Sequence, residues 1–390
     1  MTADVIVIGG AVMGSSVAYW LTKLSPGLDV LVVEQDSSFS KAATSRSVAS
    51  IRQQFTTAVN VEISRFGIGF LRTFAEQLGQ LADVGSLGLK ENGYLFVTGQ
   101  PDTAAVMAEV AQMQRQHGAG TEIWGPEQIK ARFPWLEVGD LVAGSFGPHD
   151  EGWFDNMGLM AGFKAAARAQ GARFVSDKAT GLRVQDGRVT GVTLAGRGEV
   201  VCDAVVNAAG TRAAEVMAWA GLPHAVEPRK RTVFVIDAPN ARYPDAPLLV
   251  DAGFYLRPEA NHWITATVPA EDGPCDPGDF EPDLHLFEDV IWEQLYARSR
   301  SFDAVKVVRH WVGHYDYNTL DQNAILGPHP ALPNLHLMSG FSGHGLQQSP
   351  AVGRGVAEHL LTGAWQTIDL SDLSVARMVE GRPFRERAVV

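Results

Sequence analysis

Hydrophobic residues near the amino terminus follow a strand, helix, strand pattern. A short apolar run over residues 4–8 ends at two glycines, and apolar residues at helical spacing follow over residues 11–24. A second apolar run over residues 29–33 ends at Glu34. This order predicts one β-α-β unit, in which a helix connects two neighbouring parallel strands.

The same patterns predict further elements along the chain. Apolar residues at helical spacing predict helices over residues 60–81, 101–117, 156–170, 284–297 and 346–361. Apolar runs predict strands over residues 93–98, 172–176, 200–209 and 335–339. A hairpin over residues 181–192 is expected to turn at Asp186 and Gly187.

Between residues 223 and 312 the chain changes to short β-rich pieces separated by Pro and Gly. The strand and helix after residue 335 then complete the first domain from the far end of the chain. We therefore predict an α/β fold (α+β in its two-domain arrangement), with a Rossmann-like dinucleotide-binding domain and a β-rich substrate domain built on a mixed sheet. The first domain is assigned residues 1–85, 145–222 and 325–390, and the second is assigned residues 86–144 and 223–324.

Composition supports two folded domains. The chain has 390 residues, and single hydrophobic cores stop growing at about 250 to 300 residues. A formal net charge of -12 disfavours a nucleic-acid partner. No apolar run approaches the roughly 20 residues of a membrane-spanning helix, so no membrane span is expected.

The first residues and the cysteines indicate a reducing compartment. A strand-like run directly after Met1 leaves no room for a charged leader. Cys202 and Cys275 lack the paired spacing of a zinc or redox site. We expect a cytoplasmic protein with two reduced thiols and no metal.

The turn between the first strand and helix has the residues of a dinucleotide site. Gly9 permits a tight turn, the small Ala11 lets backbone approach a pyrophosphate, and Gly14 allows close packing of helix on strand. Glu34 follows 20 residues after Gly14 and can accept hydrogen bonds from a ribose. The alternative is an ordinary strand-to-helix turn beside a solvated carboxylate. The predicted site comprises Gly9, Gly10, Ala11, Met13, Gly14, Glu34 and Gln35.

Two other segments carry weaker signals. A glycine-rich stretch over residues 339–345 precedes a helix, and the start of a helix favours negative charge. Read alone, it is equally well a glycine-rich turn without a ligand. The small, polar stretch over residues 42–54 contains Arg46 and Arg52, and Arg52 could hold a carboxylate through two parallel hydrogen bonds. An isolated arginine is more often a surface or ion-pair residue.

The β-rich half carries a set of aromatic and histidine side chains that could line an amine pocket or simply pack within a sheet. From the residues alone we do not choose among Tyr255, His262, His310, Trp311, His314, Tyr315 and Tyr317. Neither a Ser/His/Asp set nor a zinc-binding motif appears, so hydrolase and metalloenzyme functions lack support.

With these segments together, the chain resembles the D-amino-acid oxidase superfamily of FAD enzymes, on the branch of sarcosine and glycine oxidases. The likeness runs through most of the chain. Residues 50–55, 340–348 and 366–370 are most similar to bacterial relatives of the mitochondrial FAD-dependent oxidoreductase-domain protein that assists complex I assembly.

The resemblance implies FAD, with adenosine near Glu34 and Val175 and the flavin ring between Ser45-Arg46 and a turn over residues 343–346. It implies that Arg52 binds a substrate carboxylate, that Tyr255 is a pocket tyrosine and that His344 lies beside the flavin. The implied cofactor residues beyond the first turn are Ser45, Arg46, Val175, Ala209, Gly210, Gly343, His344, Gly345 and Leu346.

Three departures from the family pattern change these expectations. Gln347 stands where sarcosine oxidase has a second basic residue, which weakens a specific prediction of sarcosine. The covalent FAD cysteine of that relative falls near His314, where no cysteine occurs, so FAD is expected to be non-covalent. The oxygen-activating lysine should lie between Pro258 and Pro274, where no lysine occurs, and this favours a quinone or flavoprotein over oxygen as electron acceptor.

The implied reaction transfers a hydride from the α carbon of a small, secondary or N-methyl amino acid to flavin N5. The imine product then hydrolyses in water. The expected partners are an amino-acid or amine substrate and an acceptor: oxygen, a quinone or a flavoprotein. The alternative is a flavin-containing assembly or interaction protein with little catalysis, and an NAD-dependent dehydrogenase is disfavoured by the late glycine turn.

Overall fold

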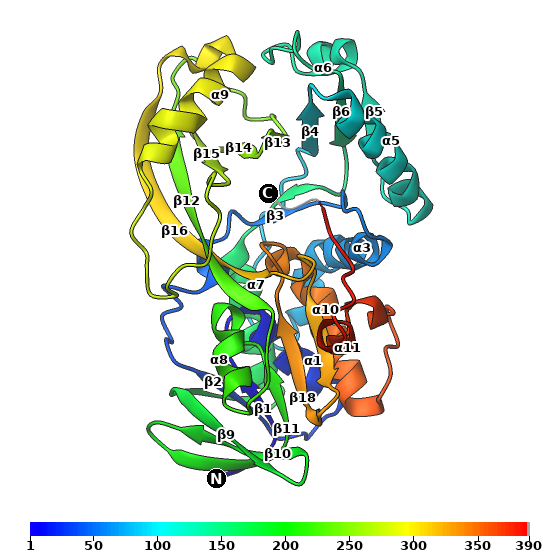
Figure 1. Cartoon of the computed structure of the whole chain (residues 1–390), viewed down its shortest axis with the longest axis vertical. Coiled ribbons are helices and arrows are strands. Elements are labelled where there is room, and N and C mark those ends of the chain that lie inside the picture. Colours follow the sequence, from blue (N-terminus) through cyan, green and yellow to red (C-terminus); the bar gives the residue numbers. More distant parts are fainter. Residues whose placement is uncertain (388–390) are drawn as a thin grey trace.

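The computed structural model of the protein describes residues 1–387, and two large β-sheets form its framework (Figure 1). The first sheet has the order β17-β18-β11-β1-β2-β8, with the β9-β10 hairpin attached to β11. The second has the order β16-β12-β15-β14-β13-β4-β6-β5. A small pair, β3 (Ser50–Ile51) and β7 (Gly152–Trp153), forms a separate antiparallel ladder.

The first sheet confirms the predicted β-α-β unit, since β1 pairs in parallel with both β2 and β11. The predicted hairpin also forms, and both of its turn residues, Asp186 and Gly187, have positive φ. The strands of this sheet are β1 (Thr2–Ile8), β2 (Val30–Glu34), β8 (Arg173–Ser176), β9 (Ala179–Gln185), β10 (Arg188–Leu194), β11 (Gly198–Asn207), β17 (Ile325–His329) and β18 (Leu332–Ser339).

Helix α1 (Val12–Leu24) lies in the core of this half. It packs against α10 (Gly345–Thr362) on one side and α7 (Asn156–Ala169) on another. Every residue from Val12 to Thr22 is buried. A helix enclosed by its neighbours has no face for charged side chains, and this stretch contains none. Figure 1 shows these helices stacked beside the strands of the first sheet.

Helices α1 and α10 approach each other closely because small residues meet at their contact. A Cβ added to Gly353 of α10 would lie only 2.1 Å from the Ser16 hydroxyl oxygen of α1. That hydroxyl donates to the Ser349 carbonyl at 2.7 Å, and the Trp20 indole donates to the Pro350 carbonyl at 3.0 Å. The contact therefore sets the two helices side by side in one register.

The second sheet is mostly antiparallel, and the long pair β12-β16 forms one side of it. Its one parallel pairing among the described residues joins β13 to β4. The strands are β4 (Tyr94–Thr98), β5 (Glu122–Trp124), β6 (Ala143–Gly147), β12 (Val226–Asp237), β13 (Leu248–Asp251), β14 (Phe254–Glu259), β15 (His262–Thr267) and β16 (Lys306–Asn318). The predicted fold class, an α/β protein with a mixed substrate sheet, is confirmed.

One predicted helix is wrong in its extent. The segment expected as one helix over residues 60–81 forms α3 (Ala58–Arg72) and α4 (Phe74–Leu78), with Thr73 between them at φ -102° and ψ 11°. The Thr73 hydroxyl donates to the Gly69 carbonyl at 2.9 Å. This kind of side-chain bond to the preceding turn competes with regular helix bonding.

Most of the remaining helical segments are short. They are α2 (Ala43–Arg46), α5 (Pro101–Gln116), α6 (Pro126–Arg132), η1 (Gly210–Arg212), α8 (Ala213–Ala218), η2 (Phe287–Ile291), α9 (Trp292–Arg298), η3 (Arg300–Asp303), η4 (Ser371–Leu373) and α11 (Val375–Val379). Over residues 1–387, no helix is long and apolar enough to cross a membrane.

The assigned domain boundaries stay a prediction. Strands of the first sheet fall within residues 2–34, 173–207 and 325–339, and those of the second fall within residues 94–147 and 226–318. Strand β6 crosses the assigned boundary at residue 145 and pairs within the second sheet.

Near its end the chain returns to the start of α3. The Glu386 carboxylate is fully buried and accepts from the Thr56 N–H at 2.9 Å, the Thr57 hydroxyl at 2.9 Å and the Asn60 amide at 3.1 Å. A negative group at the start of a helix is stabilised by the helix dipole. The last described residues thus hold the segment that links Arg52 to α3.

Candidate functional site

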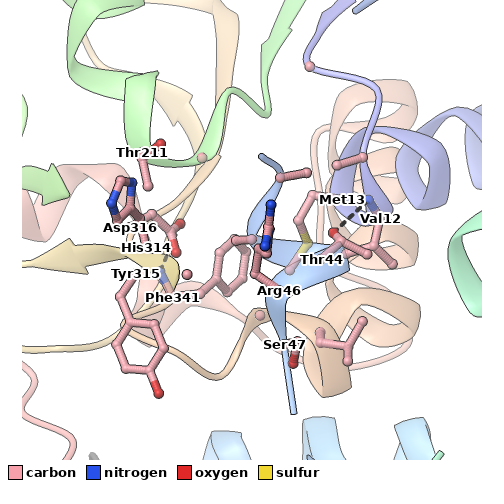
Figure 2. A pocket seen from close by; sticks show the side chains of 18 of the residues that line it. Val12, Met13, Thr44, Arg46, Ser47, Thr211, His314, Tyr315, Asp316 and Phe341 are labelled. Atoms are coloured by element: carbon pink, nitrogen blue, oxygen red, sulfur yellow. Dashed lines mark hydrogen bonds between the residues drawn. The ribbon is translucent and has the colours of Figure 1, made fainter. Parts of the chain in front are cut away.

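One cavity extends from the glycine turn after β1 to the second sheet. In Figure 2, Val12, Met13 and Thr44 face Thr211, His314 and Tyr315 across it, with Arg46 and Phe341 between. The wall includes most of the residues predicted from the sequence: Gly9, Ala11, Met13, Glu34, Gln35, Arg46, Arg52, Ala209, Gly210, Tyr255, Gly343, His344, Gly345, Leu346 and Gln347.

The first end of the cavity is a cradle of backbone. Gly9 has φ +99°, and a Cβ there would lie 2.4 Å from the Ala208 carbonyl oxygen. Helix α1 begins at Val12 without a side-chain cap from Ala11, and the Val12 N–H donates to the Thr44 hydroxyl at 3.3 Å (Figure 2). The N–H groups at the start of a helix and the helix dipole suit a pyrophosphate.

Glu34 joins this turn to the end of β2. Its carboxylate accepts from the Gly10 N–H at 2.8 Å and from the Asp36 N–H at 2.8 Å. A carboxylate has about four lone-pair sites, so two remain for the hydroxyls of a ribose. The arrangement fits the dinucleotide role predicted for Glu34.

Four predicted cofactor residues do not form part of the cavity wall. Gly10 contributes its N–H to Glu34, and a Cβ on Gly14 would lie 1.8 Å from the Gly9 carbonyl oxygen, so both support the turn from behind. The Ser45 hydroxyl donates to the carbonyls of Phe39 at 2.6 Å and Ala42 at 3.0 Å. Val175 pairs with Val33 in the sheet.

The second glycine turn forms another part of the cavity wall. Gly343 has φ +94°, and a Cβ there would lie 2.6 Å from the Tyr315 ring. Helix α10 begins at Gly345, again without a side-chain cap from His344. The starts of α1 and α10 therefore line one cavity, which suits a ligand with negative charge at two places.

Asp316 holds this second turn and was missed from the sequence. Its buried carboxylate accepts from the Gly340 N–H at 2.8 Å and the Phe341 N–H at 3.2 Å. Burial raises the pKa of Asp316 to about 6, although the backbone N–H bonds act in the opposite direction. The signal in the sequence was that Asp316 is the single acidic residue among the aromatic residues of β16.

Arg52 occupies the far end of the cavity and is buried. One terminal nitrogen donates to the Tyr94 hydroxyl at 3.3 Å, and the other lies 3.1 Å from His344 Nε2. Its backbone N–H donates to the Gln347 side-chain oxygen at 2.8 Å. The structure thus brings together Arg52, His344 and Gln347, which were predicted from segments far apart in the chain.

Aromatic rings surround the guanidinium. Its central carbon lies 4.8 Å from the ring centre of Phe55 and 5.5 Å from those of Tyr94 and Phe96. Tyr255 packs against the cluster that contains Tyr94. Tyr94 was missed because nothing in its own strand distinguishes it from a packing residue, whereas the resemblance had named Tyr255, and Tyr315 belonged to the aromatic set from which no choice was made.

A buried carboxyl group lies behind Arg52. Glu151 accepts from the Gln53 N–H at 2.7 Å and from the Gln54 amide at 2.7 Å, and only 1% of the residue is exposed. Burial raises its pKa to about 7 against the opposing effects of Gln54, Gln53 and the Arg52 charge. Over residues 1–387, no group of three or more His, Cys, Asp or Glu could hold a metal ion.

Comparison with known proteins gives consistent results. Residues 4–359 match the family model described as FAD dependent oxidoreductase. The chain is 37% identical to FAD-dependent oxidoreductase domain-containing protein 1 of Bos taurus, covering 100% of the chain and 87% of that protein. Mitochondrial dimethylglycine dehydrogenase of Mus musculus is 27% identical over 93% of the chain and 42% of that protein.

A solved structure shares the whole architecture. The crystal structure of L-proline dehydrogenase from P. horikoshii matches with a TM-score of 0.86 and 25% identity. The match covers 98% of this chain and 99% of the other.

We expect Glu151→Gln to flatten the pH dependence of the free energy of unfolding. The pKa of Glu151 is raised from 4.5 to about 7, so between these values the native carboxyl holds a proton that the unfolded chain releases. Its contribution is complete below pH 4.5 and is lost as pH rises through 7. Wild type should lose about 1 to 3 kcal/mol from this group between roughly pH 5 and pH 8, and the variant should not.

Urea unfolding at both pH values measures this difference. Glu76→Gln, at an exposed position of α4, is the matched control and should keep the wild-type slope. A wild-type slope in Glu151→Gln would show that the carboxyl is ionised in the native protein across the whole range.

Proposed function

The chain belongs to the DAO family of FAD-dependent oxidoreductases, and from this premise we propose that it oxidises a small amino acid at its α carbon. The amine in this proposal is secondary or N-methylated. The observation that carries the proposal is the buried Arg52 guanidinium, which lines the same cavity as the two glycine turns that fit FAD.

Bound FAD supplies an acceptor for a hydride. In the proposed reaction, Arg52 binds the substrate carboxylate through charge-assisted hydrogen bonds. Tyr94 and His344 orient its two terminal nitrogens, and Gln347 fixes its backbone. Binding by these groups holds the α carbon in one orientation, which lowers the entropic part of the barrier.

The remaining walls exclude water from the reacting carbon. Leu248, Val233, Tyr255 and Tyr315 line the substrate end. Burial raises the pKa of both tyrosines, so their hydroxyls stay neutral and can hydrogen-bond an amine nitrogen. The substrate binds as the free amine, and the imine product hydrolyses after release into water.

An alternative function is a flavin-containing assembly or interaction protein with little catalysis. The specific observation in its favour is a group of exposed apolar side chains on and beside α9: Leu284 at 49%, Trp292 at 50% and Tyr296 at 42%. A flavoprotein that no amine reduces would favour this function. The cytoplasmic location stays a prediction.

Anaerobic bleaching of the flavin near about 450 nm tests the leading proposal. The substrates are N-methylglycine, L-proline, longer N-methyl amino acids and D-amino acids.

We expect Arg52→Ala to lower kcat/KM for the best carboxylate substrate by about a hundredfold or more, because a buried carboxylate loses its charged partner. Arg65→Ala, at an exposed position of α3, should leave it unchanged. Full efficiency in Arg52→Ala would assign the carboxylate to another group.

We propose that FAD is held without a covalent bond. Cys202 lies buried in β11 and Cys275 lies in the loop after β15, and the cavity wall contains neither. Acid precipitation of the purified protein should therefore leave nearly all of the yellow colour in the supernatant. Flavin retained on the pellet would point to a covalent link through a residue other than cysteine.

We propose a dehydrogenase rather than an oxidase. The segment over residues 258–274, where the resemblance places an oxygen-activating lysine, contains neither Lys nor Arg. A cation there would favour electron transfer to oxygen. Stopped-flow reoxidation of the reduced protein should be slower with oxygen than with an artificial acceptor by about tenfold or more. Equal rates would contradict the proposal.

A further inference from the structure

The substrate end of the cavity contains a second buried arginine. Arg231 of β12 lines the same wall as Arg52, and only 6% of its side chain is exposed. Its guanidinium carbon lies 4.9 Å from the ring centre of Tyr315, the ring that packs against Gly343. Arg231 therefore stands one aromatic ring away from the second glycine turn.

Tyr315 lies within electrostatic reach of both arginines. Burial raises the pKa of its hydroxyl, and the charges of Arg231 and Arg52 each lower it. A small amino acid bound at Arg52 would thus extend its other substituents toward Tyr315 and Arg231. Two cations in such a space would ordinarily favour a ligand with two carboxylates.

Arg231, however, already has a carboxylate partner. Its terminal nitrogens donate to the two oxygens of Asp272 at 2.7 Å and 2.9 Å, in the parallel geometry typical of a strong pair. Arg229 lies 3.3 Å from the same carboxylate and also donates to the Asp272 backbone carbonyl. The side chain of Asp272 is 21% exposed, so most of the pair is shielded from water.

The loop that carries Asp272 is fixed to β12 at further points. The Cys275 N–H donates to the Pro228 carbonyl at 3.0 Å, and Lys230 pairs with Asp279 at 3.2 Å and Asp283 at 3.0 Å. A ligand carboxylate would have to displace a partner that is held in place by the chain itself. If it did not, it would find the Arg231 charge already compensated by Asp272.

We infer that Asp272 determines substrate specificity: by pairing with Arg231, Asp272 leaves no uncompensated cation beside Tyr315 and restricts the site to amines that carry a single carboxylate. This inference rests on the proposed function and specifies its substrate class. Uncharged substituents, such as a methyl group or a pyrrolidine ring, meet the Tyr255 and Tyr315 rings and the apolar wall at no electrostatic cost.

The test compares pairs of amines that differ by one carboxylate in the FAD-loaded protein. The pairs are N-methylglycine with N-(carboxymethyl)glycine, and L-proline with pyrrolidine-2,5-dicarboxylate. The dissociation constant of each is obtained from the ligand-induced change in the flavin spectrum and from the concentration dependence of anaerobic flavin reduction. In the pair that wild type binds more tightly, we expect the dissociation constant of the monocarboxylate to be at least about tenfold lower than that of the dicarboxylate.

Asp272→Asn should shift this ratio toward the dicarboxylate by about tenfold or more, with the monocarboxylate constant changed by less than about threefold. Asp279→Asn is the matched control, since it removes one charge from the same loop but from the partner of Lys230. It should keep the wild-type ratio. Adding Arg231→Met to Asp272→Asn should abolish the gain, because the uncovered cation is then absent.

The outcomes separate the inference from the proposed function. An unchanged ratio in folded Asp272→Asn, or an equal shift in Asp279→Asn, would overturn the inference alone. If Asp272→Asn does not fold, wild type still decides, because tight binding of the dicarboxylate would overturn it. Failure of every amine in the panel to reduce the flavin would overturn the proposed function and the inference with it.

Discussion

The close contact between α1 and α10 is the constraint on which the site depends. At Gly353 there is room for the Ser16 hydroxyl but for no side chain, and the resulting bond to the Ser349 carbonyl fixes the relative position of the helices. Because both helices begin at the same edge of the first sheet, their N-termini open into one cavity. A wider spacing would separate the two positive helix ends and leave two unrelated turns.

The cavity then depends on how buried charges are compensated. Arg52 contacts the Tyr94 hydroxyl and the Phe55 ring, and burial shifts the Glu151 carboxyl behind it toward its neutral form. The Arg231 guanidinium forms two hydrogen bonds to the Asp272 side chain, at 2.7 Å and 2.9 Å. A guanidinium in a two-pronged ion pair has little net charge to offer a further anion. The partner of Arg231 therefore limits what this buried arginine can bind.

The sequence predicted the parts of the site whose requirements are local. Gly9 and Gly14 follow from a turn that leaves no space for a Cβ, and Glu34 follows from the spacing of a strand end. The resemblance supplied Arg52 and His344, and the structure places them 3.1 Å apart although 292 positions separate them. What could not be predicted were residues whose role arises only from tertiary contact. Asp316, Glu151 and Tyr94 become distinctive once the turn or guanidinium they support is placed beside them.

The cofactor end and the substrate end of the cavity are built differently, and this affects how substrate choice can change in such a fold. The cofactor cradle is made of backbone and glycine, and a side chain added at Gly9 or Gly14 would meet other main-chain atoms at 2.4 Å or 1.8 Å and is excluded by sterics. The substrate end is made of side chains from β12, β14 and β16, whose register is fixed by the ladder while their chemistry is not. Exchanging Asp272 or Tyr255 leaves those ladders intact. Specificity can therefore change at the second sheet while the first continues to hold the same cofactor.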